Sequence, residues 1–217
     1  MLNMDFHKPV TIQTLQQQWV ASPMPGVWRK PLAREDMEKG HATSIVRYDP
    51  GASFSPHGHP KGEEILVLEG TFSDESGDYQ AGTYFRNPEG FSHAPFSKEG
   101  CVILVKLYQF QSEDRTHSCI DTDSAQWINI GSGLFRLPLH HFQNEQVEMI
   151  RSSEDAVLNL ADARLGVELY IIAGCLADEE GVYSEGCWIR KPARGDQTFK
   201  IMAGSKVWIK SNHLFNQ

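Results

Sequence analysis

Cysteines are few and widely spaced in this sequence. The four of them include no Cys-x-x-Cys pair and lie at Cys101, Cys119, Cys175 and Cys187. Zinc ribbons need cysteines paired at short spacing, and small disulfide scaffolds need a much higher density of them. The sequence therefore indicates neither kind of site, and we expect buried or partly buried free thiols.

Long apolar runs and basic clusters are also missing. The first twenty residues lack the basic start and apolar run of a signal peptide, and no later stretch approaches the roughly 20 apolar residues of a membrane span. Lys and Arg number 20 against 28 Asp and Glu, for a formal charge of -8, and no Lys/Arg cluster offers a patch for phosphate backbones. We therefore expect a cytoplasmic protein that binds neither membranes nor nucleic acid.

The rest of the composition is that of an ordinary globular protein. Hydrophobic residues make up 40% and charged residues 22% of the 217 residues, with no low-complexity tract. This length allows two modules of about 100 residues, each able to bury its own core.

Segments rich in β-forming residues recur at short spacing, separated by Gly, Pro, Asp and Ser clusters typical of turns. This pattern is typical of a β-sandwich or barrel. Only Thr11 to Val20 has a helix-like spacing, with Ile12, Leu15 and Trp19 on one face, and we predict a short helix there. The expected strands are Ala42–Tyr48, Ile65–Leu68, Thr83–Arg86, Cys101–Tyr108, Val147–Ile150, Glu168–Ala173, Cys187–Arg190 and Lys206–Lys210.

An internal repeat links the two halves of the chain. The segment GEEILVLEG at 62–70 is echoed by GVELYIIAG at 166–174, and GTYFRNP at 82–88 by GCWIRKP at 186–192. By subtraction of residue numbers, the matching Gly and Pro residues all lie 104 positions apart. One repeat covers roughly 24–112 and the other roughly 127–210, so we predict a first domain at 1–117 and a second at 118–217, with SEDRTHSCIDTDSAQ as the polar joint.

The first repeat gathers residues with the chemistry of metal ligands. Residues two apart on a strand point to the same face, so His57 and His59 can present both imidazoles to one interior point. With nine His in the chain such a pair arises easily by chance, and its neighbours make the case. Glu63 follows across a Gly-containing turn, and His93 lies after a strand and a Pro/Gly turn that can return the chain to the same pocket. Three nitrogens and a carboxylate oxygen suit Zn²⁺, Fe²⁺, Mn²⁺, Ni²⁺ or Cu²⁺ alike.

These residues also carry a family resemblance. Gly51-x5-His57-x-His59-x3-Glu63-x6-Gly70 resembles the first cupin motif, and Gly82-x5-Pro88-x-Gly90-x2-His93 resembles the second, except that Ser97 stands where cupins usually have Asn. The resemblance implies an all-β fold of two tandem double-stranded β-helix (jelly-roll) barrels, a bicupin, with few short helices.

More narrowly, the first repeat resembles the cupin domain of the ChrR-type anti-sigma factors. The similar segments are PGVWRKPL at 25–32, EEILVLEGTFSDESGDYQAGTYFRNP at 63–88, and Ser92-His93-Ala-Pro with Gly100-Cys101. This resemblance implies the same four ligands, His57, His59, Glu63 and His93, and zinc as the metal. Iron, manganese and nickel stay open, because the ligand set does not choose among them.

The second repeat lacks these ligands. Adding 104 to their numbers gives Ala161, Ala163, Val167 and Gln197, none of which binds metal as the originals do. We therefore expect the second barrel to be degenerate, with a structural role or a pocket for something other than metal.

Three further side chains of the first repeat leave alternatives open. Glu64 competes with Glu63 as a ligand, but adjacent strand residues point oppositely, so only one can face the metal. Tyr84 and Arg86 either line the metal cavity, or Arg86 lies outside it, paired with an acid. Trp28 either closes the barrel mouth or simply packs.

Three functions are compatible with this sequence. A metal held by four protein ligands keeps open positions for a small molecule, as in the cupin dioxygenases of dicarbonyl-like substrates. The ChrR resemblance favours instead a regulator or sensor in which a metal or bound ligand shifts the barrel's conformation. A metal-independent scaffold is the third alternative, which the intact ligand set disfavours. A sigma-factor partner is not expected, because the helical domain that grips it in that family has no counterpart here. A homodimer is compatible with exposed barrel strands.

Overall fold

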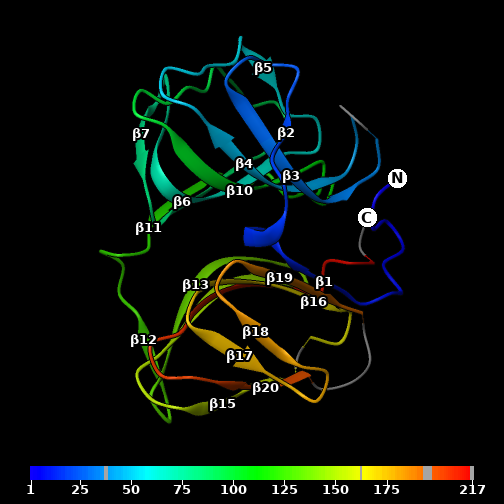
Figure 1. The fold of residues 1–217 in the computed structure, drawn as a ribbon, viewed down its shortest axis with the longest axis vertical. Coiled ribbons are helices and arrows are strands. Elements are labelled where there is room, and N and C mark those ends of the chain that lie inside the picture. The colour runs from blue at the N-terminus through cyan, green and yellow to red at the C-terminus, as the bar shows by residue number, and fades with distance from the viewer. Residues whose placement is uncertain (37–38, 162, 193–196, 216–217) are drawn as a thin grey trace. The chain divides into compact units, whose positions relative to one another are not determined.

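The computed structural model describes residues 1–36, 39–161, 163–192 and 197–215. Nearly all regular structure in these ranges is antiparallel strand (Figure 1). The described part of the chain contains one turn of 3-10 helix, η1 at Thr14–Gln16, and no helix long and apolar enough to cross a membrane. The chain divides into two compact units, unit 1 of residues 1–4 and 17–124, and unit 2 of residues 5–16 and 125–217.

Unit 1 is built on one large sheet in the order β11-β8-β6-β10-β4-β3-β2, with β7 added to β6, and on a separate two-stranded sheet, β5-β9. All the pairings are antiparallel. The strands of this unit are β2 (Val20–Ala21), β3 (Val27–Arg34), β4 (Ala42–Tyr48), β5 (His57–Gly58), β6 (Glu63–Asp74), β7 (Gly77–Gln80), β8 (Thr83–Asn87), β9 (Ser92–His93), β10 (Cys101–Leu107) and β11 (Ser118–Asp121).

Unit 2 has a seven-stranded sheet in the order β1-β19-β16-β21-β14-β13-β12 and a four-stranded sheet in the order β15-β20-β17-β18. Its core lies between the two sheets, since the buried cluster combines Leu169 and Ile209 of the larger sheet with Leu176 and Phe199 of the smaller. The strands are β1 (Val10–Gln13), β12 (Ile128–Gly131), β13 (Leu134–Phe142), β14 (Glu145–Ser152), β15 (Ala156–Leu160), β16 (Val167–Ala173), β17 (Cys175–Ala177), β18 (Val182–Ser184), β19 (Cys187–Lys191), β20 (Gln197–Ile201) and β21 (Lys206–Ser211).

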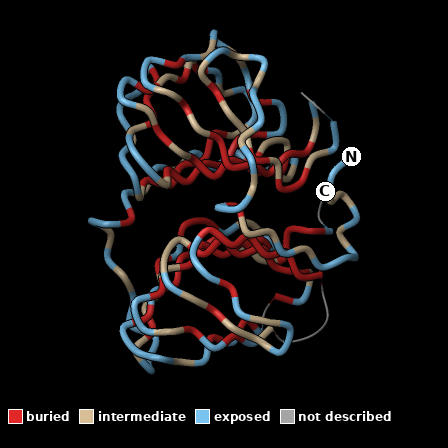
Figure 2. The backbone as a smooth tube through the Cα atoms, viewed as in Figure 1, coloured by how far each residue is buried: buried red, intermediate tan, exposed pale blue. Residues whose placement is uncertain are grey.

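Strand alternation decides which side chains enter the core of unit 1. Along β6, Ile65 and Val67 belong to the core cluster, so Glu63, two residues earlier, points to the same side. Glu64 and Leu66 point to the other face of the sheet and are buried as well. Figure 2 shows buried residues concentrated along the large sheet of each unit. β6, which carries Glu63, therefore lies in a sheet whose side chains are buried on both faces.

All eight predicted strands are confirmed. Ala42–Tyr48 is β4 with the same bounds, and the others lie within or overlap β6, β8, β10, β14, β16, β19 and β21, differing by a few residues at their ends. These segments were recognisable because their β-branched and aromatic residues lie between Gly and Pro turns.

The helix predicted at Thr11 to Val20 is wrong. Val10–Gln13 forms the edge strand β1, which pairs with β19 of the same unit, and only one 3-10 turn follows. The Thr14 hydroxyl and amide both donate to the Gly186 carbonyl, at 2.7 and 3.0 Å, which fixes the chain against β19. Tertiary pairing overrides a helical spacing only ten residues long.

The predicted domains were 1–117 and 118–217, whereas contacts assign residues 5–16 to unit 2 and the stretch 118–124 to unit 1. β1 pairs with β19, and β11 pairs with β8, which accounts for both assignments.

Among the cysteines, Cys101 and Cys187 are buried and Cys175 is partly buried, but Cys119 is exposed; all four are free thiols.

Candidate metal centre

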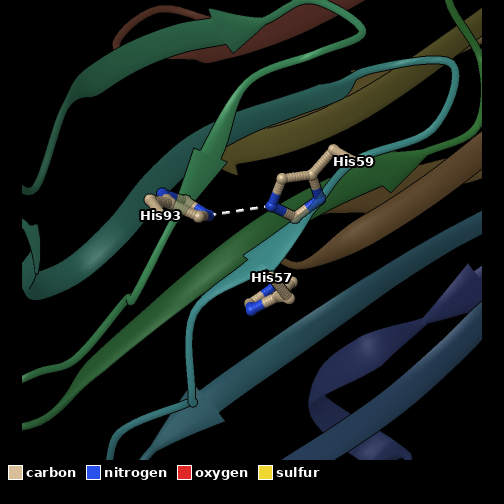
Figure 3. A group of neighbouring side chains, drawn as sticks. All are labelled: His57, His59 and His93. Carbon is tan, nitrogen blue, oxygen red and sulfur yellow. Dashed lines mark hydrogen bonds between the residues drawn. The ribbon is translucent and has the colours of Figure 1, made fainter.

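His57 and His93 come together because their short strands pair. β5 and β9 form an antiparallel two-stranded sheet in which His57 lies directly opposite His93, and Gly58 opposite Ser92. Residues opposite each other in such a ladder place their side chains on the same face. Figure 3 shows the two rings approaching a common point from these two strands, with the ring of His59 completing the group.

A tight turn after β5 brings Glu63 to the same point. The Gly62 amide donates to the His59 carbonyl at 3.0 Å, and Lys61 and Gly62 both have positive φ, 57° and 76°. A side chain at Gly62 would place its Cβ 2.5 Å from the ring of Phe110, so the position accepts only glycine without rearrangement. The turn reverses the chain and starts β6 at Glu63, whose carboxylate enters the barrel.

The nitrogens and the carboxylate converge closely. Nε2 of His59 lies 2.9 Å from Nε2 of His93, and Oε2 of Glu63 lies 3.5 Å from the first and 3.3 Å from the second. Each of His57, His59 and His93 offers a ring nitrogen within 4.8 Å of those of the other two. His59, Glu63 and His93 are buried, while His57 is partly buried.

Hydrogen bonds select which ring nitrogen faces this point. Nδ1 of His57 lies 2.8 Å from the Ser55 carbonyl, and Nδ1 of His93 lies 2.9 Å from Oδ2 of Asp74. A carbonyl or carboxylate oxygen only accepts, so Nδ1–H is the donor and the lone pair is left on Nε2. Metal-binding histidines have this arrangement, in which the other ring nitrogen donates to a carbonyl or carboxylate.

Without a cation, the buried cluster favours neutral groups. Burial, followed by the nearby His93 and His57, lowers the pKa of His59 to about 3. Burial also lowers the pKa of His93, although its hydrogen bond to Asp74 acts in the opposite direction. For Glu63, burial raises the pKa to about 8, against the hydrogen bond from Asn87, 3.2 Å from Oε2. A divalent cation changes only the carboxyl group, because it stabilises the ionised carboxylate and binds the imidazoles in their neutral form.

The donor set fits a divalent metal ion. Three imidazole nitrogens, two of them with the lone pair on Nε2 by hydrogen bonding, and one carboxylate oxygen are ligands that zinc and the first-row transition metals accept. Nε2 of His59 and Nε2 of His93 face each other at hydrogen-bond distance, and a cation satisfies both lone pairs at once. The structure thus brings together all four residues predicted as ligands, and a three-histidine cluster that could hold a metal ion is present.

Glu64 takes no part in this cluster. It lies on the opposite face of β6, where Tyr84 donates to Oε1 at 3.1 Å and Arg86 to Oε2 at 3.2 Å. Arg86 also pairs with Asp114 at 2.5 Å, and all these side chains are buried. The prediction that Tyr84 and Arg86 line the metal cavity is therefore wrong, because side chains alternate along β8 and these two point to the opposite face from Asn87. The alternative prediction, that Arg86 is paired with an acid, is confirmed.

Trp28 packs and does not close the barrel. Its Nε1 donates to Oδ2 of Asp49 at 2.7 Å, and the guanidinium of Arg47 lies over its ring, 5.5 Å from the centroid. In the described part of the chain Trp28 does not line the cavity beside the histidines.

The cavity beside the cluster has a volume of about 250 Å³ and is reached by His57, His59 and Glu63. Its walls are mostly apolar side chains of the sheet, and two arginines of β3 also line it. The lining includes Arg29, Arg34, Val46, Tyr48, Ile103 and Val105.

Sequence reasoning missed two residues of the centre. Asn87 binds Glu63, and Asp74 binds His93. A signal for Asp74 was available in the repeat, since DESGDY at 74–79 is matched by DEEGVY at 178–183, again 104 residues apart. Taken by itself, this segment is typical of a turn.

In unit 2 two of the four counterparts of the ligands lie in the apolar interior, whereas Ala161 is exposed and Gln197 is partly buried. Ala163 and Val167 belong to the core cluster, and Gln197 begins β20. In this unit the carboxylate of Asp178 is bound by Nζ of Lys191. The second repeat has therefore kept the sheet framework, and its described residues contain no three-histidine cluster.

A sequence model of the ChrR Cupin-like domain matches residues 7–111 and, a second time, residues 115–211. The chain belongs to the ChrR cupin-like family. It carries the domain twice, as the internal repeat indicated, and the resemblance of the first repeat to the ChrR cupin is confirmed. None of the curated proteins gives a significant sequence match to it.

Solved structures share the cupin fold of this family member at low sequence identity. A candidate dioxygenase from Nostoc punctiforme has a TM-score of 0.77 at 14% identity, over 97% of this chain and 85% of its own. The pirin YhhW of Escherichia coli, in complex with nickel(II), has 0.71 at 12%, over 94% and 98%. The oxalate decarboxylase of Bacillus subtilis, studied for its Mn(II) centres, has 0.65 at 12%, over 94% and 77%. At such identities the likeness establishes the fold, a bicupin of two jelly-roll barrels.

Proposed function

We propose that unit 1 binds one divalent metal ion through His57, His59, Glu63 and His93, and that the ion binds a small molecule held in the adjoining cavity. The observation that carries the proposal is the convergence of Nε2 of His59, Nε2 of His93 and Oε2 of Glu63 within 3.5 Å of one another at a buried point. At this spacing two neutral imidazoles can share one hydrogen bond, whereas a divalent cation engages both Nε2 lone pairs and the carboxylate at once.

The cavity supports a small-molecule ligand. Its wall of Val46, Ile103 and Val105 suits an apolar body, and Arg29 and Arg34 provide positive charge on the same lining. A ligand with an apolar part and an oxygen anion, such as a β-dicarbonyl enolate or a carboxylate, matches both features. When bound, the metal supplies a Lewis acid for such an oxygen.

In this proposal, residues of unit 1 exclude water from the ion and hold its ligands in place. Burial of His59, Glu63 and His93 excludes water from one side of the ion. Asn87 restrains the Glu63 carboxylate by donating to Oε2 at 3.2 Å, and the Ser55 carbonyl restrains the His57 ring. Both a metal-dependent enzyme and a metal-dependent sensor require this arrangement.

Metal analysis together with turnover tests the proposal and separates its two forms. Protein purified without added metal is analysed for bound metals and then tested for oxygen uptake with a panel of β-dicarbonyls. About one iron or manganese per chain with turnover supports an enzyme, whereas one tightly held zinc without turnover supports a sensor. A chain that takes up no metal, even when supplied with zinc, iron, manganese and nickel, contradicts the proposal.

A further inference from the structure

Asp74 ends β6 beside the metal centre and forms hydrogen bonds through both carboxylate oxygens. Oδ2 accepts from Nδ1–H of His93 at 2.9 Å. Oδ1 accepts from the Ser76 amide at 2.8 Å and from the Tyr79 hydroxyl at 3.2 Å. The side chains of Asp74 and His93 are each only 1% exposed, so water does not compete for these bonds.

The same arrangement recurs in unit 2, where the part of the chain that the structure describes has no three-histidine cluster. Oδ1 of Asp178 accepts from the Glu180 amide at 2.8 Å and from the Tyr183 hydroxyl at 2.9 Å, as Oδ1 of Asp74 does from Ser76 and Tyr79. The other oxygen differs, because Oδ2 of Asp178 is bound by the ammonium of Lys191. The bonds of Oδ1 thus belong to the hairpin of both repeats, and the bond of Oδ2 is specific to each.

From this comparison we infer that Asp74 is a positioning residue, which holds His93 as the Nδ1–H tautomer and so keeps the Nε2 lone pair directed at His59 and Glu63. In unit 2 the same carboxylate holds the Lys191 ammonium, a fixed positive charge, where the first repeat holds a metal-ligand histidine. The inference about the tautomer stands without a metal, and its consequence for metal affinity rests on the proposed function.

The variant Asp74→Asn changes the hydrogen bond to His93 and keeps the hydrogen bonds within the hairpin. The Ser76 amide and the Tyr79 hydroxyl both need an acceptor, so the Asn oxygen takes the place of Oδ1 and its NH₂ faces Nδ1 of His93. An NH₂ group donates, so Nδ1 must accept and the proton moves to Nε2, where it blocks the ligand position. Replacing a histidine's carboxylate partner by Asn has this consequence in the serine protease triad. Because the hairpin bonds survive, a residue with only a structural role would tolerate the change.

The tautomer of His93 is measured directly in the full chain after removal of metal by a chelator. Two-bond ¹H–¹⁵N correlation spectra distinguish a protonated Nδ1 from a protonated Nε2, and loss of one signal set in His93→Gln assigns His93. We expect Nδ1–H in the wild type and Nε2–H in Asp74→Asn. A protonated Nε2 in the metal-free wild type, or an unchanged tautomer in Asp74→Asn, overturns the inference. If Asp74→Asn does not fold, the wild-type spectrum alone decides.

Zinc affinity provides the second readout, measured by competition with a chromophoric chelator. Loss of an outer hydrogen-bond partner costs about 10- to 100-fold in affinity, and we expect a loss in this range for Asp74→Asn. The matched control is Asp178→Asn, the same substitution in the repeat without the cluster, which should change neither the His93 tautomer nor the zinc affinity. Equal affinities for Asp74→Asn and wild type overturn the positioning role. Failure of the wild type to bind zinc leaves the spectroscopic test in force, and failure to bind zinc, iron, manganese and nickel alike contradicts the proposed function.

Discussion

His57 and His93 lie directly opposite each other in an antiparallel ladder of only two residues per strand, although they are 36 positions apart in the sequence. This pairing joins His57 of the first cupin motif to His93, the last residue of the second. A small change in the turn that follows β5 or in the turn that precedes β9 would therefore separate the imidazoles. The metal centre depends on local backbone pairing as well as on the identity of its side chains.

Removing two of the proposed ligands should abolish metal binding. We expect His57→Ala with His59→Ala to retain no metal after gel filtration, because Glu63 and His93 alone leave two ligands, and to leave the fold of unit 2 intact. Elemental analysis and circular dichroism measure the two effects. The matched control is His7→Ala with His141→Ala, which removes two exposed histidines and should keep one metal per chain.

Metal binding should release a proton at neutral pH. Glu63 has a pKa of about 8 in the metal-free fold, so at pH 7 its carboxyl holds a proton that the metal displaces. Affinity therefore rises with pH up to about 8, by at most about tenfold per pH unit for one proton. His59, with a pKa of about 3, holds no proton at this pH. Calorimetry with Zn²⁺ in two buffers of different ionisation enthalpy measures the release, which should be absent in Glu63→Gln.

The same carboxyl makes the stability of the metal-free protein depend on pH. Its pKa is about 8 in the fold and 4.5 in the unfolded chain, so its stabilising contribution is complete below pH 4.5 and is lost as the pH rises to 8. His59 acts in the opposite sense, with a contribution present above pH 6.5 and lost as the pH falls toward 3. Between pH 6.5 and 8 only the Glu63 effect remains. Urea unfolding should show stability falling over this window in the wild type and a flatter profile in Glu63→Gln.

The turn before Glu63 should tolerate no side chain. Gly62→Ala adds a Cβ at a φ of 76° and 2.5 Å from the Phe110 ring, and we expect a loss of about 1–3 kcal/mol of stability together with weaker metal binding. Gly51→Ala is the control, because Gly51 has a similar φ of 80° with no atom within 4 Å of the added Cβ. Gly51→Ala should keep its metal affinity; equal effects of the two variants would mean that contact with Phe110 is unimportant.

The positive charge of Lys191 should stabilise unit 2. Lys191→Met removes the ammonium from Oδ2 of Asp178, and since both side chains are largely buried, we expect a loss of about 1–3 kcal/mol in denaturant unfolding. The double variant with Asp178→Asn should lose less than the sum of the two single variants, because the pair is then removed together. Strict additivity would contradict the coupling. Metal content should stay unchanged in all three variants.

Much of this structure could be predicted from the sequence. The eight strands and the repeat were recognisable because β-rich segments are bounded by turns whose Gly and Pro residues recur at one spacing. The same motif spacing predicted that His57, His59, Glu63 and His93 come together; that they bind a metal remains a prediction.

What the sequence did not indicate depends on tertiary context. β1 has a helical spacing, and only its pairing with β19 makes it a strand. The partners of Arg86 required knowledge of which face of β8 it occupies. Asp74 lies 19 positions before His93, and the backbone bridge between Ser73 and Phe96 brings the end of β6 beside the His93 segment.

The central claim is that four side chains of unit 1 meet at a single cation. Anomalous diffraction from crystals of the metal-loaded protein, recorded on both sides of the metal's absorption edge, tests it most directly. We predict one anomalous peak per chain, about 2.0–2.2 Å from a ring nitrogen of His57, His59 and His93 and from a carboxylate oxygen of Glu63. A peak bound elsewhere, or imidazoles that turn away from one another in the loaded crystal, would contradict it.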